Sequence, residues 1–232
     1  MNNIRTVSDT KRTFYSLHTR PINSIYRRVV EELMVEMHLL RVNVDFSYDP
    51  IYALGVVTAF DRFMQGYHPL ADQESIYQAL IKAEQDDPQR YRGDAERLEA
   101  LAKNLAVKDL IASLKSPNDG GSDQELQGHL QAIINNPKFK YSRLFAIGLF
   151  TLLEQADPKG MEDKATREEI LTQLAQVLNL PQDKLLKDLD LYRSNLEKLA
   201  QARIMMAEMT QAERKKREQR GNQAVETAQQ ST

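Results

Sequence analysis

The sequence contains no cysteine, which excludes disulfide bonds, thiolate metal sites and catalysis by a cysteine nucleophile. It also carries little net charge, a formal −2, so a global basic field that would attract nucleic acid is absent. Its two most apolar uncharged runs, residues 51–60 and 144–153, are shorter than the roughly 20 apolar residues that a membrane-spanning helix needs. We therefore expect these two runs to form buried core helices, and any membrane attachment to be peripheral.

Familiar catalytic and cofactor motifs are also missing. A di-iron helical bundle needs glutamate three residues before a histidine. The residues at that spacing before the four histidines are instead Tyr15, Val35, Gln65 and Leu126. The sequence has no His-Glu-x-x-His, no Gly-x-Ser-x-Gly, no Gly-Lys-Ser/Thr phosphate loop and no Gly-x-Gly-x-x-Gly. We therefore expect no metal, no cofactor and no catalysis.

The clearest periodic pattern predicts a helix over residues 21–42. Its apolar residues recur at steps of three and four and fall on one stripe. The stripe consists of Ile22, Tyr26, Val29, Leu33, Met37 and Leu40. Val35 and Leu39 lie on the opposite, solvated side, which favours a second, smaller apolar contact there.

His38 lies on the same solvated side, with Glu31 and Glu32 nearby in the sequence. An acid–base cluster is one interpretation of these three residues. A solvated helix face is the simpler one, and we favour it; His18 and His68 are interpreted in the same way.

Helix-capping residues and breakers divide the rest of the chain. Residues 42–48 alternate apolar and polar side chains, but no second strand is evident, so an extended connector is expected. Residues 115–121 have the composition of a loop. Helix starts are expected from cap residues or capping boxes at Asp49, Asp72, Ser122 and Thr166.

These segments predict an all-α fold, in which a compact multi-helix body supports a long projecting C-terminal helix. The expected organisation begins with an N-terminal arm containing a short helix (1–20). A helical body (21–180), a long helix (181–220) and a disordered polar tail (221–232) follow it.

The long helix carries a seam of apolar residues at alternating steps of four and three, which is typical of a coiled coil. The candidate partner interface consists of Leu185, Leu189, Tyr192, Leu196, Leu199, Met205, Met206 and Met209. Residues 185–199 favour packing within the same chain. For the methionines, which suit adaptable surfaces, internal packing and partner binding are both open.

A basic run follows the seam and has a net charge of +3 over residues 213–220. Its candidate contact residues are Arg214, Lys215, Lys216, Arg217 and Arg220. A solvated helix end explains this run, and contact with an anionic lipid surface or an acidic partner is the functional alternative. Each basic residue near such a surface contributes about 1 kcal/mol, so the anchor would be weak and sensitive to salt.

Four stretches of the chain resemble the thylakoid formation protein family of cyanobacteria and chloroplasts, also described as a photosystem II biogenesis protein. These are residues 5–67, 139–154, 183–203 and 213–220. The first begins RTVSDTKRTFYSLHTRPINSIYRRVVEELMVEMHLL, and the second is FKYSRLFAIGLFTLLE. The segment before the first stretch is too short for a transit peptide, which leads us to expect a cyanobacterial member.

The resemblance implies a role in thylakoid membrane biogenesis and in photosystem II assembly or repair. It also implies a partner, the FtsH-type membrane protease complex, whose accumulation the family supports. On this basis we expect a peripheral protein on the cytoplasmic side of the thylakoid membrane, partly soluble in the cytoplasm and monomeric when free.

Three rival hypotheses remain. A self-associating coiled-coil scaffold at the membrane surface would use the seam to pair with itself. An enzyme with an unfamiliar site would show a deep pocket with converging charged side chains. A nucleic-acid binder is disfavoured, because the basic run has no interleaved aromatic residues.

Overall fold

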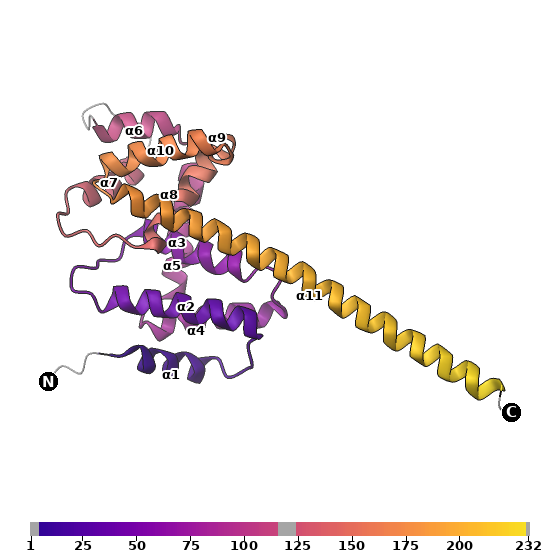
Figure 1. The fold of residues 1–232 in the computed structure, drawn as a ribbon. Coiled ribbons are helices and arrows are strands. Elements are labelled where there is room, and N and C mark those ends of the chain that lie inside the picture. Colours follow the sequence, from indigo (N-terminus) through magenta and orange to yellow (C-terminus); the bar gives the residue numbers. More distant parts are fainter. Residues whose placement is uncertain (1–4, 116–123, 231–232) are drawn as a thin grey trace. The chain divides into compact units, whose positions relative to one another are not determined.

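The structure, a computed structural model, describes residues 5–115 and 124–230, and within these ranges it contains helices and no strand. The expected all-α class is confirmed (Figure 1). In chain order the helices are α1 (Val7–Leu17), α2 (Ser24–Arg41), α3 (Pro50–Phe63), α4 (Leu70–Ala83), α5 (Pro88–Ala102), α6 (Val107–Lys115), α7 (Gln124–Ile134), α8 (Arg143–Ala156), α9 (Pro158–Glu162), α10 (Lys164–Val177) and α11 (Gln182–Gln230).

The chain divides into two units, Met1–Tyr192 and Arg193–Thr232. The first unit contains α1 to α10 together with the opening turns of α11. The second unit consists, in its described part, of the remainder of α11 alone. The first unit therefore includes turns that the sequence had assigned to the separate long helix.

The core of the first unit is the pair α3 and α8. Every residue from 51 to 60 and from 144 to 153 is buried, as the two uncharged runs predicted. The helices meet at Gly55 and Gly148, where each glycine faces backbone atoms of the other helix. Because neither position has room for a Cβ atom, the two helices approach more closely than side chains would allow.

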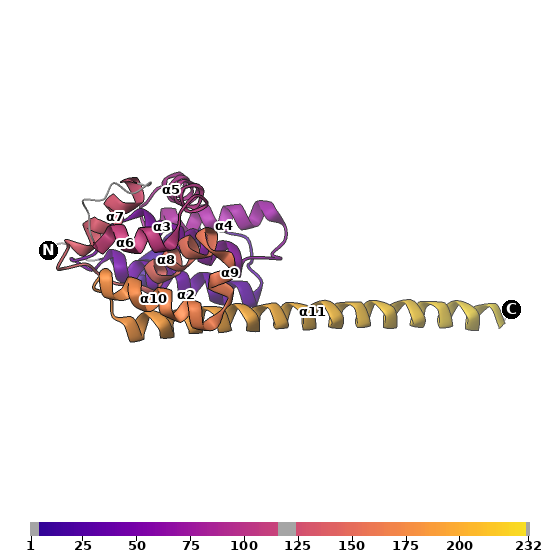
Figure 2. The same cartoon turned by 90° about the horizontal axis from the view of Figure 1, so that it is seen from above.

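The other helices of the first unit surround this pair. α3 contacts α5 and α2, which lie on opposite sides of it (Figure 2). α1 packs on α2 and α4 at one end of the unit, and α6, α7, α9 and α10 gather at the other (Figure 1). An ion pair of 2.6 Å between Arg62 of α3 and Glu154 of α8 adds a polar link at the edge of the core.

Local capping explains where the core helices begin. The Asp49 side chain accepts a hydrogen bond from the Tyr52 amide at 2.8 Å, as the sequence predicted. The Ser142 hydroxyl accepts one from the Phe145 amide at 3.0 Å and so caps α8. Each cap satisfies a backbone donor that the helix itself leaves unpaired.

Two expected helix starts are wrong because a nearby residue provides the cap. α2 begins after Asn23, whose side chain accepts from the Ile25 amide, and not at Pro21. α10 begins after Asp163, which accepts from the amide of Thr166 at 2.8 Å, so the Thr166 box lies inside the helix.

Asp72 is also not a helix cap. α4 begins at Leu70 after Pro69, and Asp72 lies in its first turn. The Asp72 carboxylate instead forms a 2.5 Å ion pair with Arg20, which precedes α2. An acidic residue is favourable in a first turn as well as at a cap, so the local pattern did not separate the two positions.

The expected capping residue Ser122, and most of the loop 115–121, lie outside the described residues. The helix end expected at Gly221 is not seen, because α11 runs on to Gln230. A glycine inside a helix costs about 1 kcal/mol relative to alanine and does not by itself end the helix.

Candidate functional site

A groove of about 1150 Å³ lies on the outward face of α2 in the first unit. Its second wall is formed by the segment that leads into α8 and by the opening turns of α11. Its lining includes Lys11, Arg27, Val35, Leu39, Lys140 and Lys184. The groove is a shallow, open surface and therefore suits a macromolecular partner better than an enclosed small molecule.

The groove has an apolar strip and a charged rim. Val35 and Leu39 are one helical turn apart on α2, and Leu39 is 58% exposed. Lys11 and Glu31 form an ion pair of 2.8 Å on the rim, and the Tyr15 hydroxyl donates to the same carboxylate at 2.6 Å. These two donors hold the pKa of the Glu31 carboxyl below its usual value, so it stays charged.

The far wall of the groove is held in place by contacts between distant segments. Arg143 of α8 pairs with Glu36 of α2. The Tyr141 hydroxyl donates to the Asp188 carboxylate of α11 at 2.9 Å. Residues far apart in the chain are thereby fixed around one surface, which no local sequence pattern could have shown.

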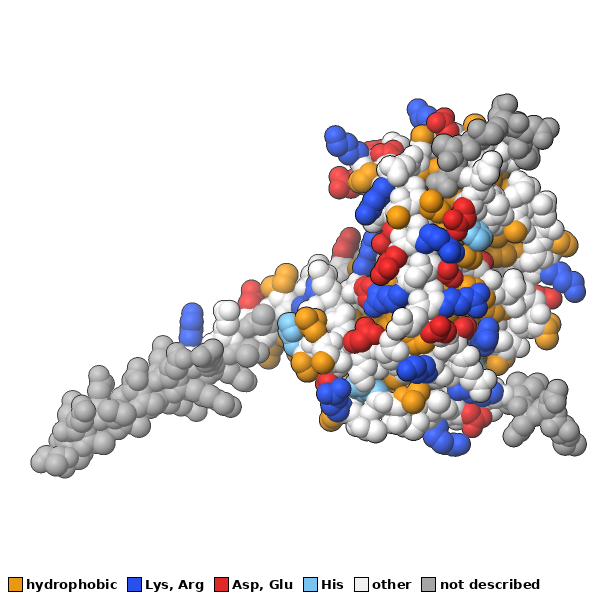
Figure 3. Space-filling model, turned by 180° about the vertical axis from the view of Figure 1, so that it is seen from behind, with side chains coloured by type: hydrophobic (Ala, Val, Ile, Leu, Met, Phe, Trp, Pro, Cys, Tyr) orange, Lys and Arg blue, Asp and Glu red, His pale blue; other side chains and the backbone are white. Residues whose placement is uncertain are grey.

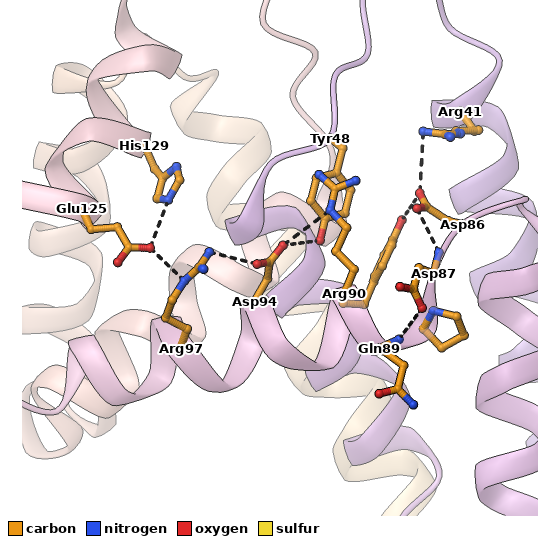
Figure 4. Close-up of polar contacts among 12 residues, drawn as sticks. Arg41, Tyr48, Asp86, Asp87, Gln89, Arg90, Asp94, Arg97, Glu125 and His129 are labelled. Carbon is orange, nitrogen blue, oxygen red and sulfur yellow. Dashed lines mark hydrogen bonds and ion pairs between the residues drawn. The ribbon is translucent and has the colours of Figure 1, made fainter.

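A smaller hollow of about 410 Å³ lies between α5, α7 and the start of α3. The Asp94 carboxylate accepts hydrogen bonds from Tyr48 at 2.6 Å and from Arg97 at 2.9 Å (Figure 4). Arg97 also pairs with Glu125 at 2.8 Å, and Arg90 stacks over the Tyr48 ring at 3.7 Å. Asp94, Arg97 and Glu125 thus pair with one another, and they offer no paired nucleophile and base.

The surface seen from behind carries mixed charge. Acidic and basic side chains are interspersed over the first unit on this face (Figure 3). Such a pattern creates little net field, so it gives no reason to expect a partner of one charge there.

His38 is buried, so its expected place on a solvated face is wrong. It is 3% exposed, and its Nδ1 atom lies 2.9 Å from the Thr10 hydroxyl and 3.5 Å from the Glu84 carboxylate. Burial raises the pKa of Glu84 to about 7, with Arg5 and Arg41 opposing the shift, and burial lowers the pKa of His38. The cluster joins α1, α2 and the end of α4 inside the protein, where it has a packing role.

His18 is buried as well, contrary to expectation. It is 1% exposed, and its Nδ1 atom lies 2.9 Å from the Ser75 hydroxyl of α4. Burial lowers the pKa of His18, which favours the neutral ring. A helical-wheel analysis could not find this contact, because the partner is 57 residues away in the chain.

The first part of the expected seam is part of the body core. Leu185, Leu189 and Tyr192 are buried, and Tyr192 packs edge to face on Phe63 of α3 with ring centroids 5.7 Å apart. The opening turns of α11 therefore act as a packed helix of the first unit.

The rest of the seam and the basic run belong to the second unit, where the seam residues are Leu196, Leu199, Met205, Met206 and Met209. Met205 and Met209 are 62% and 65% exposed, and Lys215 is exposed. The side chains of Arg214, Lys216, Arg217 and Arg220 fall outside the described residues. The coiled-coil role of the seam stays a prediction.

Over residues 5–115 and 124–230, no group of three or more histidine or acidic side chains is placed to hold a metal ion. In the same ranges, no helix combines the length and the apolar character needed to cross a bilayer.

Comparison with known proteins gives a consistent result. A family model described as Thylakoid formation protein matches residues 6–221. A curated relative named Protein Thf1 from Nostoc punctiforme is 66% identical over 225 residues, which is 97% of this chain and 96% of the relative. Protein Thf1 from Trichormus variabilis is 66% identical over 224 residues, with the same two coverages.

A solved structure is also similar. The structure of Psb29 at 1.55 Å superposes with a TM-score of 0.78 at 46% sequence identity, and the match covers 92% of this chain and 98% of that one. In all these comparisons the similarity runs over nearly the whole chain.

Proposed function

Because this chain belongs to the thylakoid formation protein family, we propose that it is a non-enzymatic helper in thylakoid membrane biogenesis and in photosystem II assembly or repair. The observation that carries the proposal is the family match over residues 6–221. The groove on α2 and the smaller hollow beside α5 agree with it, because both are open and neither places a nucleophile beside a base.

The proposed mechanism is binding and support of membrane FtsH protease complexes. The protein would act at the cytoplasmic side of the thylakoid membrane as a peripheral component and would also occur free in the cytoplasm as a monomer. Two features of α11 support a docking role. Met205 and Met209 present exposed, adaptable apolar groups one turn apart, and a basic run follows them.

The length of α11 also favours a binding role. The helix has 49 residues, which corresponds to about 70 Å at 1.5 Å per residue. The second unit begins at Arg193 and, as far as Gln230, carries no further helix on which α11 could fold back within that unit. Binding to a partner would add packing contacts along this helix and so stabilise it.

The test is affinity capture from solubilised thylakoid membranes with the tagged full chain and detection of FtsH with an antibody. The variant Met205→Gln/Met209→Gln keeps helix propensity and removes the apolar groups. A second variant replaces the basic run with glutamine at Arg214, Lys215, Lys216 and Arg217. The full chain is kept because truncation before Tyr192 would remove buried residues of the first unit.

A matched control places glutamine at two exposed leucines outside α11, Leu17 and Leu70, which are 48% and 68% exposed. We expect recovery of FtsH with the wild-type chain and this control, and a several-fold loss with the methionine variant. Equal recovery with the methionine variant would move the contact away from α11. Absence of FtsH with every chain would refute the protease as partner.

A self-associating scaffold is the second candidate, and the exposed methionines of α11 favour it as well. Sedimentation velocity over a range of protein concentrations separates the two. A monomer at tens of micromolar argues against self-pairing. A dimer that the Met205→Gln/Met209→Gln variant abolishes would establish it.

A further inference from the structure

The groove on the outward face of α2 is lined by more basic than acidic side chains, so part of its positive charge is not neutralised. Six basic and four acidic residues line it, a balance of +2. Three basic residues form ion pairs with three of the acids: Lys11 with Glu31, Arg28 with Glu32, and Arg143 with Glu36. The fourth acid, Asp188, accepts the Tyr141 hydroxyl.

Three cations form no ion pair with a carboxylate among the described residues: Arg27, Lys140 and Lys184. Arg27 interacts with Glu31 only through longer-range electrostatics, and Lys11 already pairs with that carboxylate. All three cations are exposed. They come from three separate parts of the chain, namely α2, the segment before α8 and the first turn of α11. Lys184 lies 5.2 Å from the centroid of the Tyr141 ring, a contact that leaves its charge available.

The apolar strip lies within this ring of charge. Val35 and Leu39 face the groove one turn apart, and Leu39 is 58% exposed although it lies in the last turn of a helix whose other face is buried. An occupant that covers the strip must therefore present apolar groups in the centre and negative charge at the edges.

We propose that this groove binds an acidic amphipathic α-helix of a protein partner. At about 1150 Å³ the groove is larger than the usual range for small ligands, and it is open along its length. Strand addition is excluded at this site, because the walls are helices and a loop with no free strand edge in the described residues. Recognition of a proline-rich segment needs a groove lined by several aromatic residues, and Tyr141 is the one aromatic residue among those lining this groove.

This site differs from the exposed methionines of α11, and it does not depend on the protease as partner. The apolar side chains of the bound helix would cover Val35 and Leu39. Its Glu or Asp residues on either side would face Arg27 on one wall and Lys140 and Lys184 on the other. The sequence pattern needed in the partner is thus apolar residues four apart, flanked by acids.

The experiment selects peptides with the full-length protein as bait. A displayed library of single helices would hold leucine fixed at two positions four apart and would vary the flanking positions among Glu, Gln and Lys. We expect glutamate to be enriched at the flanking positions. The affinity of a selected peptide should fall about tenfold for the triple variant Arg27→Gln, Lys140→Gln and Lys184→Gln.

Two controls make the result specific. The variant Lys82→Gln, Lys108→Gln and Lys159→Gln removes the same charge from exposed sites outside the groove and should select the same peptides as wild type. The single change Leu39→Gln should also weaken binding about tenfold, whereas Leu70→Gln should not.

Three outcomes would overturn the proposal. The first is a selection with no preference for glutamate, and the second is an equal selection by the triple groove variant. The third is binding of phosphatidylglycerol vesicles that requires Arg27, Lys140 and Lys184, with no peptide selected. That last result would assign the groove to an anionic lipid surface instead.

Discussion

Replacing Gly55 by alanine should strongly destabilise the protein, because the added methyl group has no space. A Cβ atom at this position would lie 2.7 Å from the Leu144 carbonyl carbon and 2.9 Å from the Gly148 amide nitrogen, and closer still to the Leu144 oxygen. All three atoms belong to the backbone of α8, so no rotation of a side chain can relieve the overlap.

The helices α3 and α8 would have to move apart, and that movement determines how much the free energy of unfolding falls. Both are 14 residues long and are buried on all sides over ten consecutive residues, 51–60 and 144–153. A gap of about 0.5–1 Å forfeits a quarter to a half of each dispersion contact across it. Overpacking costs typically about 1–3 kcal/mol, and because backbone atoms are involved here we expect about 3 kcal/mol or more.

The assay is urea unfolding of the full-length protein followed by far-UV circular dichroism. Gly93→Ala is the matched control, since nothing lies within 4 Å of a Cβ atom there and the residue is exposed in the interior of α5. Alanine is the better helix former by about 1 kcal/mol, so this control should raise the free energy of unfolding.

A second prediction comes from the reciprocal position. Gly148→Ala should lower the free energy of unfolding by a similar amount, because its Cβ atom would overlap the Ile51 carbonyl group of α3. The double variant should cost less than the sum, since one separation of the helices relieves both overlaps. A Gly55→Ala protein within about 0.5 kcal/mol of wild type would refute the close helix contact.

Other variants test the buried polar groups. Burial raises the pKa of Glu84 from 4.5 to about 7, so the native state binds the proton more tightly and wild-type stability falls as pH rises between these values. The stability of Glu84→Gln relative to wild type should therefore rise over that range, by about 3 kcal/mol at pH 8. A stability difference that does not change with pH in urea titrations would contradict this. Ser142→Ala removes the buried cap of α8. It should lower the free energy of unfolding by about 1–2 kcal/mol, measured as a fall in the thermal unfolding midpoint. Ser142→Asn should retain most of the wild-type stability, because asparagine can also cap a helix. An equal loss of stability in the two variants would argue against a capping role.

Single-helix features were predictable from the sequence. The uncharged runs at 51–60 and 144–153 are the buried core helices, and Asp49 caps α3 as expected. These properties depend on neighbours within one or two turns, so the local sequence contains the necessary information. The family resemblance, drawn from long strings of residues, is confirmed by the match over residues 6–221.

The helical pattern of apolar residues and the capping residues led to wrong expectations where a polar side chain contacts a distant segment. His38 was placed on a solvated face, yet it packs against Thr10 and Glu84. Asp72 was assigned as a cap, yet it pairs with Arg20. A helical wheel shows which face of a helix is apolar, but it does not show which polar residues a second helix will cover.

The sequence by itself thus determined the helical class, the two core helices and the family. The tertiary structure alone decided the groove. Arg27 and Lys184 lie more than 100 residues apart, and contacts between distant segments, Arg143 with Glu36 and Tyr141 with Asp188, bring them to one surface with Lys140. The exposure of Leu39 and the balance of charges around it are properties of that assembled surface. They arise from which helices pair, and pairing depends on contacts between distant residues that local patterns do not encode.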